Sequence, residues 1–497
     1  MIESLPVLLI ALPIVAAATV LVAGQFDHRV GWPLTLLAMV GQVALAGWLA
    51  VSVVTEGRVD YAVGNFEIPY GIELVVDGLS ATVVLLVAAV SLAVLAYVRR
   101  AGPHSVGFFV MYLLLVTGLT GMTVTGDVFN LYVFLEITGL AGYALVATGE
   151  GGRAAVSALK YLIVGTIGAS LYLLGVGYAL VSTGTLNMAD LAATFGTAAA
   201  PYDSTLVVTA FALMVAGLAV KVALYPLHTW QPGAYANAPD SVSVFISALV
   251  STVSAYALAR VVFSVFTVDF FDAVPLAQDA LVTIAAVSVV LGSALAVMQT
   301  DVQRMLAYSS VSQFGLIVAA VGIATPLAVV GAVIHLVGHA VMKGGLFAAT
   351  GIVRRRTGAR HVDDYAGLSD RAPLTAACFA LLALAMVGVP PAVGFVGKWY
   401  IVVGAFEAER WVVAAVLLVS TLLTLAYFAR LVERMYVREA TADPAGEAAM
   451  ADGGDATVSP GMLALVVGAT VAAIALGPLG PPIESALQPT LEVLLSP

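Results

Sequence analysis

Charged residues are scarce in this sequence, and their scarcity sets the class of protein. Of its 497 residues, 10% are Asp, Glu, Lys or Arg and 61% are hydrophobic, whereas a typical soluble domain carries roughly 25% charged residues. A soluble globule of this length could not cover so much apolar surface with polar groups. The composition therefore excludes an ordinary soluble domain and predicts a protein of the lipid bilayer.

The sequence also lacks the residues that most cofactor sites require. Its single cysteine, Cys378, excludes an internal disulfide and a cysteine-ligated metal or iron–sulfur cluster. No glycine-rich nucleotide loop follows a strand-like segment, and the net charge of −10 argues against nucleic acid as a partner. We therefore expect no cofactor, no metal and no enzymatic activity of its own. Energy for transport would come from an ion gradient or from a partner subunit.

Long apolar segments recur along the whole sequence. A transmembrane helix needs about 20 apolar residues, and hydropathy predicts an all-α polytopic membrane protein with about 14 transmembrane helices. The predicted spans are residues 5–24, 31–53, 78–98, 106–125, 128–148, 156–182, 204–234, 240–266, 278–299, 302–323, 326–350, 374–404, 411–437 and 460–478. We interpret 5–24 as a first helix rather than a signal peptide, because it is long enough to span and no basic residue precedes it.

The loops between these spans differ in charge. Thirteen of the sixteen arginines lie near loops that follow odd-numbered spans, and acidic residues gather in the other loops. Cytoplasmic loops carry an excess of Lys and Arg. The pattern therefore predicts a multi-pass protein of the cell membrane with both termini outside.

The four lysines predict an internal repeat. All four lie in apolar segments, as two pairs: Lys160 with Lys221, 61 residues apart, and Lys343 with Lys398, 55 residues apart. On our count the pairs occupy the sixth and seventh spans and the eleventh and twelfth. A shift of five spans reverses topology, which is typical of the inverted repeats of secondary transporters.

Proline and glycine indicate where the repeats are broken. Proline removes a backbone donor and interrupts a helix, and a broken helix in a membrane must be buried in protein or line a cavity. We therefore expect broken seventh and twelfth helices, at Pro226 and Pro232 and at Gly388, Pro390, Pro391 and Gly394. The predicted organisation is 1–105 (three helices), 106–270 (first repeat), 271–439 (second repeat), 440–459 (polar linker) and 460–497 (C-terminal transmembrane helix).

Three charges lie deep inside predicted spans. A charge at mid-membrane costs about 2.5–3.5 kcal/mol on insertion scales, so such residues persist where they pair or serve a function. Lys221 and Lys398 are both deep, and a buried lysine can load and release a proton. Glu136 is the only acid deep within a predicted helix and is the expected counter-charge of Lys221. The alternative is a static ion pair that holds helices together.

His335, His339 and Lys343 recur every four residues, so they share one face of a helix. Histidine gives and accepts a proton near neutral pH, and the stripe therefore predicts a proton relay. The spacing would also suit two zinc ligands, but no third ligand is evident. Histidines that serve only packing are the other alternative.

Two further basic residues carry less specific signals. Lys160 lies seven residues after Arg153, so it could extend to the cytoplasmic interface instead of acting in transport. Its pairing with Lys343 in the repeat favours a function. His228 follows Lys221 closely and could pass protons towards the cytoplasm, or it could be a hydrogen-bonded structural residue.

At these residues the chain resembles the antiporter-like subunits shared by Mrp-type sodium/proton antiporters and respiratory complex I. The motifs that carry the resemblance span nearly the whole chain: DVFNLYVFLEITGLAGYALVA, KVALYPLHTWQPGAYANAPDSVS, DVQRMLAYSSVSQFGLI, HLVGHAVMKGGLF and GVPPAVGFVGKW. The resemblance implies fourteen helices, which include two inverted five-helix repeats with broken helices 7 and 12. It also implies a pair between Glu136 and Lys221, and a polar axis through His335, His339 and Lys343 to Lys398.

Two positions refine this resemblance. A lysine at 398 resembles the Mrp D subunit, and the length fits that subunit as well. Family members usually carry a lysine or histidine where Thr252 stands, in ALVSTVSAYALAR. Thr252 therefore leaves three alternatives open: water held by Thr252, Ser251 and Ser254 bridges the two halves, the halves are uncoupled, or protons follow another route.

The resemblance implies a proton- and sodium-translocating subunit of a multi-subunit Mrp-type antiporter, with other subunits and the bilayer as partners. The alternative is a proton-pumping membrane subunit of a redox-driven, complex I-like assembly. A membrane scaffold with static ion pairs is the third hypothesis.

Overall fold

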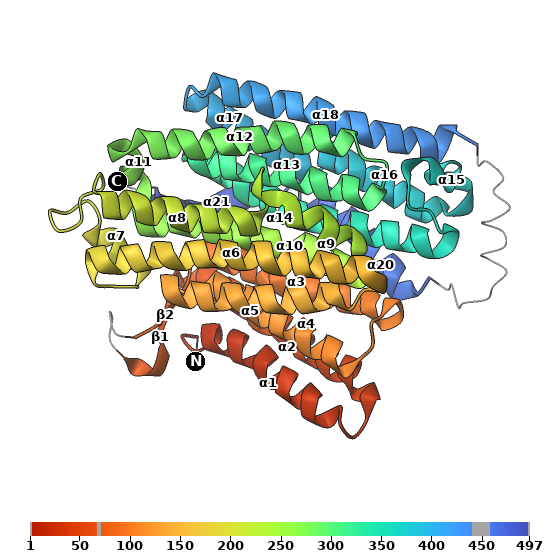
Figure 1. Ribbon diagram of the computed structural model, residues 1–497, viewed down its shortest axis with the longest axis horizontal. Coiled ribbons are helices and arrows are strands. Elements are labelled where there is room, and N and C mark those ends of the chain that lie inside the picture. Colours follow the sequence, from red (N-terminus) through yellow and green to blue (C-terminus); the bar gives the residue numbers. More distant parts are fainter. Residues whose placement is uncertain (1, 67–70, 440–457, 496–497) are drawn as a thin grey trace.

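Helices make up almost all of the structure, a computed structural model that describes residues 2–66, 71–439 and 458–495. Figure 1 shows them running side by side along the long axis of the molecule. The helices are α1 (Leu5–Ala23), α2 (Gly31–Glu56), α3 (Gly78–Ala101), α4 (Val106–Val124), α5 (Val128–Ala147), α6 (Gly151–Thr183), α7 (Met188–Thr194), α8 (Thr205–Val222), α9 (Gln231–Asn237), α10 (Asp240–Val261), α11 (Thr267–Ala273), α12 (Pro275–Val297), α13 (Val302–Ile323), α14 (Pro326–Thr357), α15 (Leu368–Arg371), α16 (Pro373–Val387), α17 (Val393–Glu407), α18 (Trp411–Val437), α20 (Pro460–Ala475) and α21 (Gly480–Leu494).

The predicted membrane class is confirmed. Within the described residues, twelve helices or merged helices are long and apolar enough to cross a membrane, and the bent pair of α20 and α21 makes up to thirteen. The remaining predicted span, 374–404, consists of α16 and α17, each 15 residues long. Neither half alone reaches the roughly 20 residues that a crossing needs, so the prediction of about 14 helices counts this broken pair as one.

Both predicted breaks are present. The seventh span is interrupted after α8, where Ala223 adopts a positive φ of 69°, and resumes as a short 3-10 turn, Leu227–Trp230, followed by α9. The twelfth span is interrupted between α16 and α17, where Gly388 has a φ of 102°. Glycine adopts such a conformation without the penalty of a Cβ atom. The inverted relation of the two halves stays a prediction, as does the division into domains, whose boundary at 270/271 falls within α11.

Local sequence explains where many helices begin. Side chains of Asp77, Ser105, Asp127, Ser204 and Thr325 each accept a hydrogen bond from a backbone N–H of the first turn. Such caps satisfy donors that have no partner within the helix. The short polar loops therefore set the helix boundaries.

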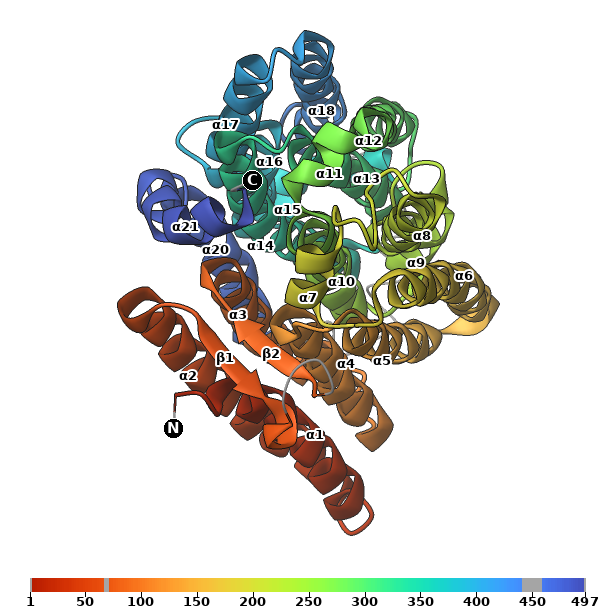
Figure 2. The same cartoon turned by 90° about the vertical axis from the view of Figure 1, so that its left-hand side faces the viewer.

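Three helices form the centre of the molecule. The most apolar stretches of α10 and α13 are 94% buried and that of α14 is 83% buried. The corresponding stretches of α1, α2, α6 and α18 are 33–39% buried. Figure 2, which views the bundle from one end, places α10 and α14 among the other helices, with α1, α2 and α18 at the rim. Polar groups on the three central helices are therefore shielded from lipid.

Both chain ends lie at one end of the bundle, as Figures 1 and 2 show. The same end carries a small antiparallel hairpin of β1 (Val59–Ala62) and β2 (Glu73–Val76), which pairs Val59 with Val76. The sequence analysis missed this hairpin and also missed α7, α15 and α21. The last predicted helix, 460–478, ends at Ala475, and the chain then turns by 76° into α21. Residues 440–457 of the predicted linker lie outside the described residues.

Candidate functional site

Lys221 lies in the last turn of α8, directly before the first break, and is 4% exposed. Its Nζ donates a hydrogen bond to the hydroxyl of Tyr143 on α5 at 3.1 Å. Oε1 of Glu136, also on α5, lies 3.8 Å from the same Nζ, and the Glu136 side chain is 23% exposed. The structure thus brings together the two charges predicted to pair. Glu136 Oε1 accepts no hydrogen bond from the described residues. Glu136 and Lys221 therefore attract each other by charge alone, and the hydrogen bond of Lys221 goes to Tyr143.

Two glycines leave room for this arrangement. A Cβ atom on Gly165 of α6 would lie 2.1 Å from the Tyr143 hydroxyl, closer than any real contact. A Cβ on Gly139 of α5 would lie 2.8 Å from the same hydroxyl and 3.1 Å from Lys221 Nζ. The hydroxyl and the ammonium therefore occupy space that any larger side chain would fill.

The predicted stripe on α14 faces α13. His335, His339 and Lys343 are fully buried. A ring nitrogen of His335, Nε2, lies 2.9 Å from Oε1 of Gln313, and the ring of His339 packs on Phe314 with centroids 4.4 Å apart. All three side chains of the stripe thus meet one neighbouring helix.

Lys343 is held by α13 through two polar contacts. Its Nζ donates to the backbone carbonyl of Leu306 at 2.7 Å and also to the hydroxyl of Ser309. No carboxylate pairs with it among the described residues. The oxygens that contact Lys343 carry no full charge. They stabilise its ammonium form less than a carboxylate would.

Lys398 lies on α17 just beyond the second break, and it is 8% exposed. Its Nζ donates to the backbone carbonyls of Met386 and Val387, at 2.9 and 3.0 Å. These carbonyls end α16 and have no partner within that helix. The neighbouring Gly397 packs against the backbone and Cβ of His335, where an added Cβ would meet atoms at 2.8–2.9 Å. Lys398 therefore lies at the end of the α14 stripe that begins with His335.

His228 lies within the 3-10 turn after the first break and is 6% exposed. Its ring stacks on Tyr225 at 5.3 Å and meets Tyr308 of α13 edge-on at 5.7 Å. Tyr308 precedes Ser309, which binds Lys343. The ring therefore lies between the first break and α13.

Lys160 differs from the other three lysines because it is exposed on α6. No hydrogen bond or ion pair to it is found among residues 2–66, 71–439 and 458–495. The position fits the predicted alternative, a side chain that extends to the interface. The structure does not bring it into the cluster of Lys221 and Glu136.

Thr252 is fully buried on α10. Its hydroxyl donates to the carbonyl of Ala248 in its own helix, at 2.7 Å. The sequence signal that pointed to this residue was a departure from a family pattern, and the structure gives it no polar contact to another helix among those described.

Sequence reasoning missed several polar neighbours of these residues: Tyr143, Ser309, Gln313, Gln231 and Tyr235. All lie at helical spacing within apolar segments, where a tyrosine or serine is compatible with ordinary packing. Only the spacing of Tyr143, seven residues after Glu136, placed it on the same face of one helix.

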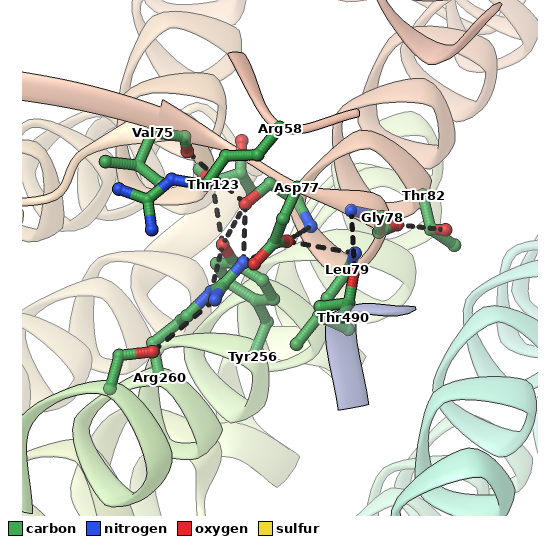
Figure 3. A network of polar contacts seen from close by, with 12 residues as sticks. Arg58, Val75, Asp77, Gly78, Leu79, Thr82, Thr123, Tyr256, Arg260 and Thr490 are labelled. Carbon is green, nitrogen blue, oxygen red and sulfur yellow. Dashed lines mark hydrogen bonds and ion pairs between the residues drawn. The ribbon is translucent and has the colours of Figure 1, made fainter. Parts of the chain in front are cut away.

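A second buried ion pair lies near the end of the bundle that carries the chain termini. Arg260 of α10 forms an ion pair with Asp77 and also donates to the hydroxyls of Ser80 and Tyr256. Figure 3 shows Asp77, Tyr256 and Arg260 in this network. The pair borders a cavity of about 580 Å³. Burial raises the pKa of the Asp77 carboxyl, but the charge and hydrogen bonds of Arg260 and two backbone N–H donors together hold that pKa below its usual value. The pair is thus an ionised, structural anchor.

The described residues contain no group of three or more His, Cys, Asp or Glu side chains that could hold a metal ion. The site instead contains a row of buried ionisable groups near the two helix breaks. Such a row can hold and hand on protons, because each lysine and histidine can exist with or without one.

Residues 125–424, more than half of the chain, match the family described as "NADH:quinone oxidoreductase/Mrp antiporter, TM". The chain belongs to this family. The matched region of this chain contains Glu136, Lys221, the α14 stripe and Lys398.

Relatives within the family carry two kinds of name. The N subunit of NADH-quinone oxidoreductase from Desulforudis audaxviator is 44% identical over 445 residues, 87% of each chain. The D subunit of a Na(+)/H(+) antiporter from Alkalihalophilus pseudofirmus is 31% identical over 427 residues, 85% of each chain.

The fold is shared with a chain in the solved structure of the membrane-bound sulfane sulfur reductase, an archaeal respiratory membrane complex. The TM-score is 0.89 and the identity 31%, and the match covers 99% of this chain and 97% of that chain. The family member described here is therefore a multi-pass membrane protein built like a subunit of larger complexes.

Proposed function

We propose that this chain is the proton- and cation-translocating subunit of a multi-subunit Mrp-type Na⁺/H⁺ antiporter. The observation that carries the proposal is the buried contact between Lys221 and Glu136 beside a broken helix. An intramembrane charge pair is costly to keep unless it serves a function. The relative named as the D subunit of a Na(+)/H(+) antiporter supports the sodium/proton assignment.

In this proposal, protons move along the buried row. Lys221 holds its proton while Glu136 is near and releases it when the contact opens. The proton then reaches the α14 stripe, passes along His339 and His335, and arrives at Lys398. Glu136, Lys221, His335, His339, Lys343 and Lys398 are the residues that carry protons, with His228 beside the first break. Lys160 and Thr252 contribute least on geometric grounds, since one is exposed and the other is bonded to its own helix.

We also propose that the protein lies in the plasma membrane and binds partner subunits there. The names of the relatives refer to subunits, so this chain is expected to work in an assembly, as a transporter subunit and not as an enzyme. The arginine-rich loops support an orientation in which the end that carries both termini faces the outer side of the membrane.

A redox-driven complex is the second candidate function. The 44% identical relative is named as a subunit of NADH-quinone oxidoreductase, and the sulfane sulfur reductase chain with 31% identity belongs to a respiratory complex. In that case the same row of residues would translocate protons, and electron transfer in partner subunits would drive it.

The deciding experiment measures sodium-dependent proton flux in vesicles from a strain that lacks its own antiporters. The gene is expressed with its operon neighbours, as wild type, Glu136→Gln or Lys221→Ala, and assembly is checked by blotting. Flux that either substitution abolishes in an assembled complex supports the antiporter. Absence of sodium-dependent flux from the intact operon refutes it, and proton pumping driven by a quinone-linked donor then tests the redox-driven alternative.

A further inference from the structure

A groove lies between two helices of the second half, α12 and α18. These helices pack on one another, and Figures 1 and 2 place both at the edge of the bundle. Their most apolar stretches are 44% and 39% buried, so much of each helix surface faces away from the protein. The groove has a volume of about 800 Å³ and lies apart from the row of ionisable residues, none of which lines it.

The wall of the groove on α12 is a single stripe of mostly aliphatic side chains. It consists of Val282, Thr283, Ala286, Val287, Val290 and Leu291. Pairs of neighbours recur every four residues in this stripe, so all of them lie on one face of the helix. The opposite wall, on α18, contains Val412, Val413 and Val416. The body of the groove is therefore apolar and favours contact with hydrocarbon over contact with water.

One end of the groove is polar. Arg410 and Trp411 lie there at the start of α18, beside Asp279 near the start of α12. Arg410 donates to Asp279 at 2.6 Å and to the side-chain oxygen of Gln278 at 3.1 Å. Trp411 is 60% exposed, and tryptophan in a membrane protein is enriched at the level of the lipid headgroups. The polar end therefore lies at the membrane surface, and the aliphatic walls extend from it into the hydrocarbon.

The length of the groove matches one leaflet of a bilayer. From Val282 to Leu291, α12 rises about 14 Å at 1.5 Å per residue, and the hydrocarbon core of a bilayer is about 30 Å thick, or about 15 Å per leaflet. On α18 the wall ends at Val416, within two turns of Trp411. A transmembrane helix of a partner subunit would continue through both leaflets. The groove therefore fits an acyl chain better than a helix.

The charges at the polar end determine which headgroup fits. Asp279 occupies one N–H of Arg410 and Gln278 another, and the remaining three N–H groups of the guanidinium have no partner among the described residues. Glu409 is exposed, and no ion pair to it is found in the described parts of the chain. Asp279, Glu409 and Arg410 together carry two negative charges and one positive charge. A headgroup with both a phosphate and an ammonium complements this arrangement, whereas an anionic headgroup would meet a net negative charge.

From this geometry we propose that the groove binds one molecule of phosphatidylethanolamine, a zwitterionic phospholipid. An acyl chain lies between α12 and α18, the phosphate accepts hydrogen bonds from Arg410, and the ammonium contacts the carboxylate of Glu409. The bound lipid fills the space that the two helices leave open near one membrane surface. The inference goes beyond the proposed function, because the site holds its lipid whether the complex exchanges sodium for protons or pumps protons by redox chemistry.

Lipid retention by the assembled complex tests the proposal. The complex is purified from the operon in detergent, washed free of loosely bound lipid and extracted, and phosphatidylethanolamine per complex is counted by mass spectrometry. Val287→Trp fills the groove from α12 and should release the bound molecule. Ile284→Trp is the matched control, because Ile284 lies on the same helix, is 47% exposed against 40% for Val287, and does not line the groove. Equal counts in the two variants would refute the site.

Headgroup selectivity tests the charges independently. Wild-type complex depleted of lipid is mixed with equal amounts of phosphatidylethanolamine and phosphatidylglycerol, and should retain the zwitterionic lipid in preference. Glu409→Gln removes the contact to the ammonium, so this preference should fall about two- to fivefold, the factor that an exposed ion pair supplies. Glu407→Gln is the control, since Glu407 is also exposed but does not line the groove. An unchanged preference in Glu409→Gln would overturn the choice of headgroup.

The occupant of the groove in the complete complex can also be captured directly. A photoreactive amino acid at position 287 is activated in membranes that contain the assembled complex, and the mass of the adduct identifies what it contacts. An adduct with phosphatidylethanolamine supports the proposal. An adduct with a partner subunit overturns it and assigns the groove to a contact between subunits. Neither result depends on transport, so failure of the lipid site and failure of the proposed function are distinguishable.

Discussion

Lys221 is bound more closely by Tyr143 than by Glu136. Its Nζ donates to the tyrosine hydroxyl at 3.1 Å, whereas the glutamate oxygen lies at 3.8 Å, beyond the usual range of a hydrogen bond. A carboxylate at that distance attracts the ammonium without fixing it. The tyrosine therefore positions the Lys221 ammonium more closely than the glutamate does.

Tyr143→Phe should slow sodium/proton exchange without unfolding the protein. The ring contacts remain, including the edge contact with Tyr161 at 4.5 Å, but Lys221 loses its hydrogen-bond partner. A hydrogen bond to a charged group contributes about 1.5–3 kcal/mol, so we expect a fall of about tenfold or more. Exchange per assembled complex in vesicles measures the effect. An unchanged rate would show that Glu136 alone positions the ammonium.

Gly165→Ala tests the same contact from a neighbouring helix. The new Cβ would lie 2.1 Å from the Tyr143 hydroxyl and must displace it, so this variant should lose exchange as Tyr143→Phe does. Gly177→Ala, on the same helix α6, is the matched control, because a Cβ there meets nothing within 4 Å. Both variants are compared for thermal stability and flux. Equal activity of the two would mean that the hydroxyl position does not matter.

Residue type and spacing predicted the parts of the site that lie along one helix. Residues that recur every four positions must share a face, so the stripe of His335, His339 and Lys343 was visible before the structure. Prolines and glycines marked both breaks in the same way. The partners across helices were not predictable, because Gln313, Ser309 and Tyr143 resemble packing residues until a fold brings them beside a charge.

Three other features of the fold gave no clear signal in the sequence. Arg260 and Asp77 are 183 residues apart, and neither position alone signals a pair. The strands β1 and β2 hold four residues each, too few for an alternating pattern to stand out. The helix α21 contains proline, glutamate and glutamine among its apolar residues, so hydropathy did not extend the last span to it.

Lys398→Arg separates a proton carrier from a structural cap. Arginine keeps the charge and the donors for the carbonyls of Met386 and Val387, but it cannot lose its proton in a protein. We expect the variant to assemble with near wild-type thermal stability and to lose exchange. Lys398→Met should lose both, because two helix-end carbonyls then lack a donor. Exchange at the wild-type rate in Lys398→Arg would show that the residue only caps α16.

Asp77→Asn should lower stability at neutral pH. The Asp77 and Arg260 side chains are 14% and 9% exposed, and removing one partner of a buried pair costs on the order of 3 kcal/mol. Because the folded pKa of Asp77 is depressed, its contribution is present above the unfolded pKa of about 4. It is lost as the pH falls through the lower, folded pKa.

The apparent melting temperature in detergent, measured from pH 7 downward, checks this sign. The gap between wild type and Asp77→Asn should be largest at pH 7 and narrow below about pH 4. Asp60→Asn is the control: its pair with Arg58 is about half exposed, so it should shift the free energy of unfolding by at most about 1 kcal/mol. A gap that stays constant with pH would mean that Asp77 contributes through shape and capping of α3, not through its charge on Arg260.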